Sequence, residues 1–361
     1  MKIGILVYRI NGVGGIEKIT AQKINAWIEM FGYEVVLITK NNIDAAFIFD
    51  INKKCKFYNL AIPSQLSGGL PQYVKNIPKV FKLYKGVEKI LKSEKIDILF
   101  TTMIGVDSLI IPFVQIKIPK ILEFHRSVFL FNSKAWFFKK TLIQFYDKVI
   151  FLNETEKKYF NLKNSIVIPN FVDGKHLDSK QERKKIIITA GRISWEKQFD
   201  HLVDIWSIVS LKYPDWKVHI YGNGNLESLN KKILEQKLEQ SFKIFPATTE
   251  IINKMQEASI FALVSATEAF PMVLLEAMSA KLPIVSYDSP HGPKNIVTDG
   301  KDGFILPLND KVAFAEKLNI LIQNPVLRDD FVKNQKTKLE LFSKEKVMNQ
   351  WNDLVMSLLS N

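Results

Sequence analysis

Two acidic residues, Glu268 and Glu276, flank the start of a predicted helix. A carboxylate only accepts hydrogen bonds, so it suits the paired hydroxyl donors of a sugar or a ribose. The backbone N–H groups of Phe270 and of Met272, Val273 and Leu274 fall between the acids, at a helix start where such donors lack intrahelical partners. The spacing therefore predicts a site for a hydroxyl-rich ligand, although one acid before a helix and one within it would be commonplace in isolation.

Two cations follow an apolar run that ends in Gly191. Arg192 offers a fork of guanidinium donors and Lys197 an ammonium point charge, which together suit a pyrophosphate. Taken alone, they would be solvated surface cations. A second apolar run ends in Gly222 and Gly224, which predicts another tight turn beside them.

A glycine-rich segment that contains Gly14 and Gly15 follows the first apolar run and leads into a helix. A helix N-terminus presents free N–H groups and a positive dipole end, both suited to phosphate. A dinucleotide fingerprint is disfavoured, because Glu17 stands where the third glycine belongs and Lys40 where an acid would hold the ribose. The alternative for this loop is a simple tight turn.

Short β-rich runs alternate with helical patterns along the chain, which predicts parallel sheets covered on both faces. Two successive series predict two doubly wound domains, with ligands at the carboxyl ends of their strands. The predicted strands are residues 3–8, 34–39, 55–60, 97–101, 120–124, 148–152 and 166–169, then 185–189, 217–221, 243–245, 259–265, 283–288 and 303–306.

A polar stretch, residues 173–184, predicts the break between the domains. We expect an N-terminal domain over 1–173 and a C-terminal domain over 174–343. Residues 344–361 form an amphipathic pattern that either closes the second domain or returns to pack on the first.

The composition is that of a globular chain, with 47% hydrophobic residues and a formal net charge of +13. Apolar runs stay below the roughly 18 residues that a membrane span needs. The single cysteine, Cys55, cannot form an internal disulfide, so a cytoplasmic protein is expected. The positive charge indicates an anionic partner or only a lysine-rich composition. Nucleic acid is not expected, since no reader motif is present.

The order and spacing of these motifs, over nearly the whole chain, resemble the family 4 glycosyltransferases of bacterial cell-surface glycan synthesis. This resemblance implies the GT-B fold, an α/β architecture of two Rossmann-like domains that face a cleft. The matching segments are Gly191-Arg192 with Glu196-Lys197, Gly222/Gly224, Glu268-x7-Glu276, Gly14-Gly15-Ile16-Glu17 and Pro169-Asn170-Phe171-Val172-Asp173.

The resemblance also implies roles. Arg192 and Lys197 would hold the diphosphate of a nucleotide-sugar donor, Glu276 its ribose and Glu268 the transferred sugar. The N–H groups near Phe270 to Leu274 would assist, and Gly14 and Gly15 would approach the phosphates. His125 resembles a histidine near the donor sugar, although a lone histidine is more often structural.

Such enzymes retain anomeric configuration and use no metal, so no metal or other cofactor is expected. Two departures are visible. Phe245-Pro246-Ala247 replaces a Phe-Gly pair near the base, and Asn295 in His291-Gly292-Pro293-Lys294-Asn295 stands where an acid is usual.

Two N-terminal segments combine lysines with apolar residues, as peripheral membrane proteins do. They are Lys75–Lys92 and Phe129–Lys140. In the first segment lysines recur on one helical face, and Ile77, Phe81, Tyr84 and Leu91 are expected on the opposite side. The alternative is a core-facing helix with a solvated lysine side. The expectation is a hexosyltransferase on the inner face of the plasma membrane, with a UDP-sugar donor and a lipid-linked or cell-surface glycan acceptor. The other hypothesis is a non-catalytic sugar-nucleotide-binding subunit that docks to membranes.

Overall fold

The computed structural model describes residues 1–41, 47–62, 70–102, 109–125, 140–172, 182–290 and 292–360, without the side chains of 70–75. The chain divides into two compact units. The first unit comprises Met1–Pro169 and Val347–Asn361, and the second comprises Asn170–Lys346. Nowhere in the described ranges is a helix both long and apolar enough to cross a membrane.

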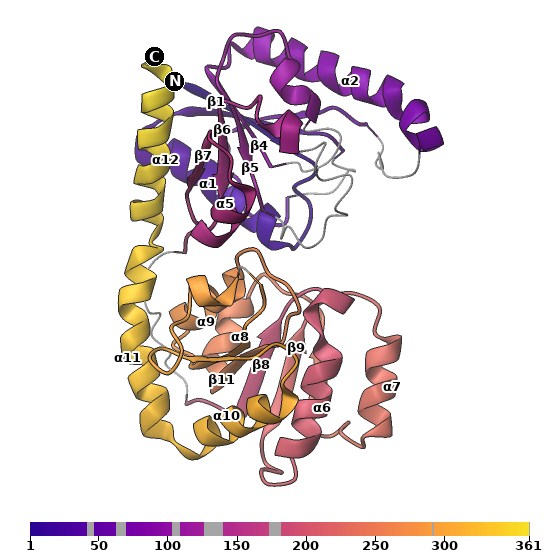
Figure 1. Cartoon of the computed structure of the whole chain (residues 1–361), viewed down its shortest axis with the longest axis vertical. Helices are drawn as coiled ribbons and strands as arrows, with labels where there is room; N and C mark the ends of the chain where they lie inside the picture. The colour runs from indigo at the N-terminus through magenta and orange to yellow at the C-terminus, as the bar shows by residue number, and fades with distance from the viewer. Residues whose placement is uncertain are drawn as a thin grey trace. The chain divides into compact units, whose positions relative to one another are not determined.

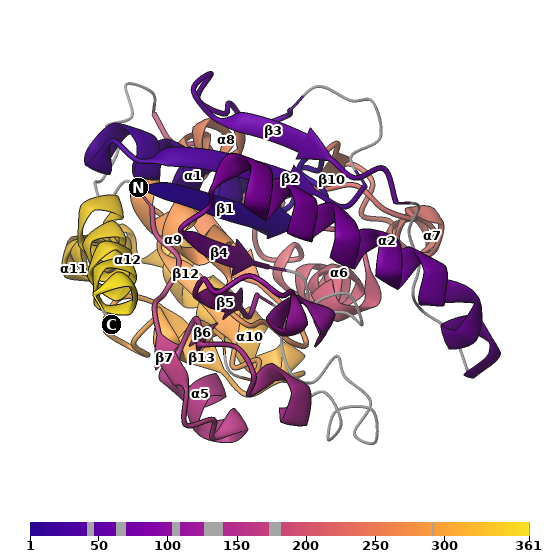
Figure 2. The same ribbon diagram turned by 90° about the horizontal axis from the view of Figure 1, so that it is seen from above.

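The first unit is built on a parallel sheet of seven strands among the described residues, in the order β3-β2-β1-β4-β5-β6-β7. Figure 2 shows β3 to β7 side by side in this order. The strands are β1 (Lys2–Val7), β2 (Glu34–Thr39), β3 (Lys56–Asn59), β4 (Ile98–Thr101), β5 (Lys120–Glu123), β6 (Lys148–Phe151) and β7 (Ser165–Val167). The helices of this unit are α1 (Gly15–Phe31), α2 (Leu70–Glu94), η1 (Ile111–Phe113), α5 (Glu154–Phe160) and α12 (Lys344–Leu359), which crosses from the second unit.

The C-terminal helix α12 packs on the first unit from Val347 onward. The Trp351 ring lies 5.5 Å from that of Phe100, and the Lys23 ammonium lies 3.6 Å from the centre of the Trp351 ring. Tyr33 donates a hydrogen bond of 2.5 Å to Asn352. In Figure 1, α12 is the yellow helix that runs beside this unit's strands.

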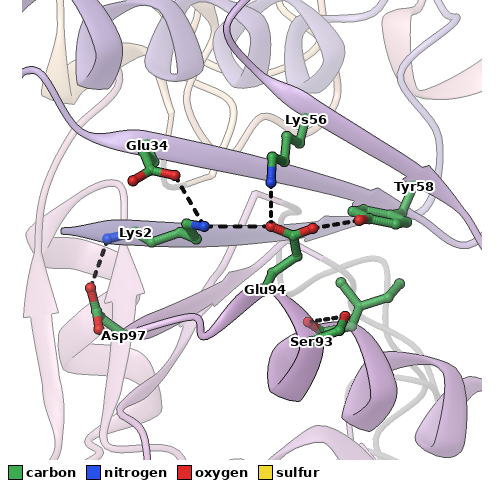
Figure 3. A network of polar contacts seen from close by, with 8 residues as sticks. Lys2, Glu34, Lys56, Tyr58, Ser93, Glu94 and Asp97 are labelled. Carbon is green, nitrogen blue, oxygen red and sulfur yellow. Dashed lines mark hydrogen bonds and ion pairs between the residues drawn. The ribbon is translucent and has the colours of Figure 1, made fainter.

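A polar network joins the amino-terminal ends of β1, β2 and β3 to the end of α2 (Figure 3). The carboxylate of Glu94 accepts hydrogen bonds from Tyr58 (2.5 Å) and Lys56 (2.9 Å). Lys2 lies 3.0 Å from Glu34 and 3.5 Å from Glu94. The hydrogen bonds from Tyr58 and Lys56 lower the pKa of Glu94 to about 2. The network lies at the sheet edge away from the carboxyl ends of the strands, so it anchors α2 rather than forming a ligand site.

The second unit repeats the same architecture in a parallel sheet ordered β10-β9-β8-β11-β12-β13. Its strands are β8 (Ile186–Ala190), β9 (Lys217–Tyr221), β10 (Phe242–Phe245), β11 (Ile260–Leu263), β12 (Ile284–Tyr287) and β13 (Phe304–Leu306). Its helices are η3 (Trp195–Lys197), α6 (Phe199–Val209), α7 (Glu227–Glu235), α8 (Ile251–Glu257), α9 (Met272–Ser279), η4 (Pro293–Asn295), α10 (Lys311–Gln323) and α11 (Pro325–Leu341).

All predicted strands occur, and their ends lie within two residues of the expected positions. The doubly wound α/β prediction is therefore confirmed in both units. In each unit the chain reverses direction across the sheet between two neighbouring strands, β1 and β4 or β8 and β11. Open α/β sheets bind ligands at the carboxyl ends of such strands.

Candidate functional site

The loops after β8 and β9 lie backbone against backbone at the switch point of the second unit. Gly191 donates its N–H to the Tyr221 carbonyl (3.0 Å), and Ile193 donates to Asn223 (2.9 Å), so the strand ladder continues into the loops. A Cβ atom at Gly222 would overlap the Gly191 carbonyl oxygen. A side chain at this position would therefore separate the two loops, which explains why the turn after β9 begins with glycine.

Lys197 and Glu268 meet at this edge. The ammonium of Lys197, at the end of η3, lies 2.6 Å from Oε1 of Glu268 in the loop after β11. Their side chains are 20% and 11% exposed. A hydrogen bond of 2.8 Å from the Ala266 N–H to the Glu196 carbonyl holds the two loops together. The ion pair uses one of the three N–H groups of the Lys197 ammonium, so the other two can donate to a ligand.

Arg192 is exposed in the loop after β8. It has no ion pair with a carboxylate in the described ranges. Arg192 precedes Lys197 by five residues in the segment that follows β8, so this segment carries a second positive charge. The edge therefore offers a cationic donor in contact with a carboxylate acceptor.

Helix α9 starts directly after Glu268 and Phe270, with Pro271 as its N-cap and no side-chain cap. One expectation for this turn is wrong. The N–H of Leu274 is not free, because the turn is tight and this group donates to the Pro271 carbonyl at 2.9 Å. The N–H groups of Met272 and Val273 remain as the first-turn donors of the helix.

The other predicted residues of this region are largely buried. Glu276 is 5% exposed within α9. The Phe270 ring packs on Phe342 at 5.6 Å, so its side chain belongs to the packing of the second unit and only its main chain remains for a ligand. The loop after β10, which departs from the family pattern, is tied to the loop after β9, because Asn223 Oδ1 accepts the Ala247 N–H at 3.0 Å.

Gly292 contributes to this site without having been assigned a role from the sequence. A Cβ atom there would lie 2.6 Å from the Cβ of Glu268 and 2.9 Å from its carbonyl oxygen. The segment that begins η4 therefore rests directly on Glu268 and fixes its position. The Gly-Pro pair was visible in the sequence, but its contact with Glu268 depends on tertiary structure. His291 lies outside the described residues.

In the first unit, Gly14 and Gly15 lie at the start of α1, as expected. A Cβ atom at Gly14 would meet Oε2 of Glu17 at 2.5 Å, whereas Gly15 faces open space. Glu17 also lies 3.6 Å from Arg9. Glu17, which replaces the third glycine of the dinucleotide fingerprint, thus lies with its carboxylate against the glycine-rich loop.

His125 follows β5, and its imidazole is buried. Nε2 lies 3.1 Å from Oε2 of Glu123, and the two side chains are 2% and 4% exposed. Lys23 of α1 lies 2.6 Å from the other oxygen, Oε1. Burial by itself would raise the pKa of the Glu123 carboxyl, but the charge of Lys23 and the hydrogen bond with His125 lower it to about 2. Sequence reasoning missed both Lys23 and Glu123, because each lies in an otherwise ordinary helix or strand.

The surface of α2 differs in part from the expected apolar stripe. Leu91 is buried in the core of the first unit, because it lies on the side of α2 that faces the sheet. Ile77 and Phe81 are 61% and 62% exposed. The ammonium of Lys85 lies 5.8 Å from the Phe81 ring centre. The Lys75 side chain and residues 129–139 of the second basic segment lie outside the described residues.

Comparisons with known proteins find glycosyltransferases among the relatives of this chain. Residues 176–338 match the family model described as "Glycosyl transferases group 1". An uncharacterized glycosyltransferase of Haemophilus influenzae is 29% identical over 98% of this chain and 99% of its own. The amylovoran biosynthesis glycosyltransferase AmsD of Erwinia amylovora is 26% identical over 98% of this chain and 99% of its own.

Solved structures show the same fold. TarM of Staphylococcus aureus, determined as a variant with fondaparinux, α-GlcNAc-glycerol and UDP, superposes with a TM-score of 0.81 at 17% identity. The match covers 98% of this chain and 99% of that one.

Proposed function

This chain is a glycosyltransferase of the GT-B fold, and we propose that it is a retaining enzyme of family 4 that transfers a hexose-type sugar from a nucleoside diphosphate. The observation that carries the proposal is the contact between Lys197 and Glu268 at the carboxyl edge of the second sheet. An ion pair that leaves further donors and acceptors at a switch point suits a ligand with both phosphates and hydroxyls.

The donor half of the site is assigned to the second unit. Arg192 and Lys197 bind the diphosphate, and the N–H groups of Met272 and Val273 add donors at the positive end of α9. Glu268 accepts hydrogen bonds from hydroxyls of the transferred sugar, held in place by Gly292. In the same assignment Glu276 binds the ribose, and the turn at Gly222 lines the nucleotide side.

The reaction proceeds by front-face attack. The bond between the anomeric carbon and the diphosphate oxygen breaks, and its electron pair stays on that oxygen. The acceptor hydroxyl oxygen forms the new bond on the same face, and its proton passes to the departing phosphate oxygen. The protein positions the reactants and stabilises the charge that develops. Arg192 and Lys197 supply this stabilisation, so the proposal includes no metal ion.

The acceptor is proposed to be a lipid-linked or cell-surface glycan, bound mainly by the first unit. Gly14 and Gly15 are assigned to the donor phosphates, and His125 to the donor sugar. Two comparisons support the substrate classes. AmsD, a relative over nearly the full chain, is named for the synthesis of the polysaccharide amylovoran. TarM was crystallised with UDP and a GlcNAc-glycerol, which supports UDP as the nucleotide.

Peripheral binding to the inner face of the plasma membrane is part of the proposal. The exposed side of α2 combines Ile77 and Phe81 with the lysines Lys82, Lys85 and Lys89. Interfacial helices present this combination to anionic lipids. The alternative, a non-catalytic docking subunit, is disfavoured because Lys197 and Glu268 are both present and in contact.

A donor screen tests the activity. The protein is incubated with UDP-, GDP- and ADP-hexoses in EDTA, and release of the nucleoside diphosphate is measured with and without a lipid-linked glycan acceptor. We expect acceptor-dependent release of the nucleoside diphosphate from one donor class. Absence of release from every donor with every acceptor tried would count against it.

A further inference from the structure

Three buried side chains of the first unit, Lys23, Glu123 and His125, contact one another in series. The proposed mechanism uses only His125. Lys23 lies 2.6 Å from Oε1 of Glu123, and Oε2 of Glu123 lies 3.1 Å from Nε2 of His125. The side chains of Lys23, Glu123 and His125 are 5%, 4% and 2% exposed. Lys23 lies in α1, Glu123 is the last residue of β5, and His125 follows it by two residues.

Burying an ion pair costs desolvation energy, which the attraction between the charges does not reliably offset. Here the C-terminal helix contributes a further partner, because the Lys23 ammonium lies 3.6 Å from the centre of the Trp351 ring. A cation over the face of a tryptophan is stabilised by the ring quadrupole. Lys23 is thus enclosed between an aromatic face and a carboxylate, and these two contacts hold its ammonium in place.

The ionisation state of Glu123 determines which ring nitrogen of His125 carries the hydrogen in their contact. The charge of Lys23 keeps the Glu123 carboxyl ionised, with a pKa of about 2 in spite of burial. An ionised carboxylate has no proton to donate, so in the contact with Glu123 the hydrogen must sit on Nε2 of His125. In the neutral ring, Nδ1 then carries the lone pair and is a hydrogen-bond acceptor.

We propose that Glu123 is a positioning residue that holds the His125 ring with its hydrogen on Nε2, and that Lys23, enclosed by Trp351, keeps Glu123 in its acceptor form. The inference rests on the proposed function, in which His125 belongs to the substrate site. A ring of fixed orientation and tautomer presents a defined acceptor to a sugar hydroxyl. If the ring orientation and tautomer are no longer fixed, kcat falls more than the affinity for the donor does.

The test uses the full-length chain labelled with ¹⁵N-histidine and the substitution Glu123→Gln. An amide can donate as well as accept, so it no longer dictates which ring nitrogen carries the hydrogen. The His125 signals are assigned by their loss in His125→Asn. We expect the wild type to show Nε2–H, and E123Q to show a mixture of tautomers. With the active donor, kcat falls about tenfold or more, while the donor KM changes less than about twofold.

Glu94→Gln is the matched control. It also removes a nearly buried carboxylate that pairs with lysine in the first unit, but at the far edge of the sheet. E94Q is expected to leave the His125 signals and kcat unchanged. If E123Q does not fold, the double substitution Lys23→Met with Glu123→Gln removes both buried charges together and is measured in its place.

A wild-type ring protonated on Nδ1 would overturn the inference, and so would His125 signals that E123Q leaves unchanged. A changed tautomer without any change in kcat would do so as well. The spectra need no substrate, so they report on Glu123 even if every transfer assay fails. Failure of the proposed function and failure of this inference are therefore separate results.

Discussion

Lys197 and Glu268 are separated by 71 residues in the chain, yet their charged groups lie 2.6 Å apart. Two features of the second unit bring them together. The parallel pairing of β8 with β11 places the loops after both strands at one edge, and the hydrogen bond from Ala266 to the Glu196 carbonyl fixes those loops. The contact thus follows from the strand order. It places an ammonium group that suits phosphate beside a carboxylate that suits sugar hydroxyls.

Replacing Glu268 by glutamine tests the role of this carboxylate. The amide keeps the shape of the side chain but loses the charge beside Lys197, and it cannot accept hydroxyl donors at both of its polar atoms. We expect kcat to fall by about a hundredfold or more, while nucleoside diphosphate affinity changes less than about threefold. Steady-state kinetics and calorimetric titration measure the two quantities.

Glu257→Gln is the matched control for that experiment. Glu257 also pairs with lysines in the second unit, Lys184 and Lys254, but lies away from the loops after β8 and β11. E257Q is expected to transfer sugar at the wild-type rate. Wild-type transfer by E268Q would remove Glu268 from the reaction.

Gly222→Ala tests the close approach of the loops after β8 and β9. The new methyl group would overlap the Gly191 carbonyl oxygen, and backbone must move to admit it. We expect a loss of about 1–3 kcal/mol in the free energy of unfolding, measured by urea denaturation. Gly191→Ala is the comparison, since its Cβ would meet side-chain atoms at 3.5–3.6 Å, which is ordinary contact. Equal stability of the two variants would mean that the loops are not packed as described.

The network around Glu94 predicts a pH dependence of stability (Figure 3). The folded-state pKa of Glu94 is lowered from 4.5 to about 2 by Tyr58 and Lys56. A group whose pKa is lowered in the folded state stabilises the fold at pH values above its unfolded-state pKa. That contribution is lost as the pH falls from about 4.5 towards 2. Glu94→Gln should therefore be less stable than the wild type at pH 7, and the gap should narrow below about pH 4.5 and nearly vanish at about pH 2. Urea denaturation across this range measures it; a gap independent of pH would contradict the assignment.

The exposed face of α2 predicts binding to anionic lipid. Removing Lys82 or Lys85 should weaken binding to phosphatidylglycerol vesicles about fivefold each, since one cation contributes about 1 kcal/mol near such a surface. Phe81→Ser should weaken it as well. Leu211→Ser removes a side chain that is 85% exposed in the second unit and should have no effect. Cosedimentation at low and high salt measures binding; equal effects of the Phe81 and Leu211 substitutions would exclude an α2-specific contact.

The sequence alone was sufficient for the strands and for the loops after them, because buried parallel strands are continuous apolar runs and glycines mark the turns. It was not sufficient for contacts between elements. The exposed position of Phe81 and the buried position of Leu91 depend on which side of α2 meets the sheet. The packing of Gly292 on Glu268 and the enclosure of Lys23 by Trp351 join segments distant in sequence, so neither has a local signal.

The measurement that tests the central claim most directly is thermal unfolding with UDP, GDP, ADP or NAD, with EDTA present throughout. A ligand that binds the native state raises its stability, by about 2.7 kcal/mol at one hundred times the dissociation constant. We predict a selective shift with one nucleoside diphosphate, UDP, and its loss in Lys197→Met. No shift with any diphosphate, or a shift with NAD alone, would contradict the assignment of this edge to a nucleotide-sugar donor.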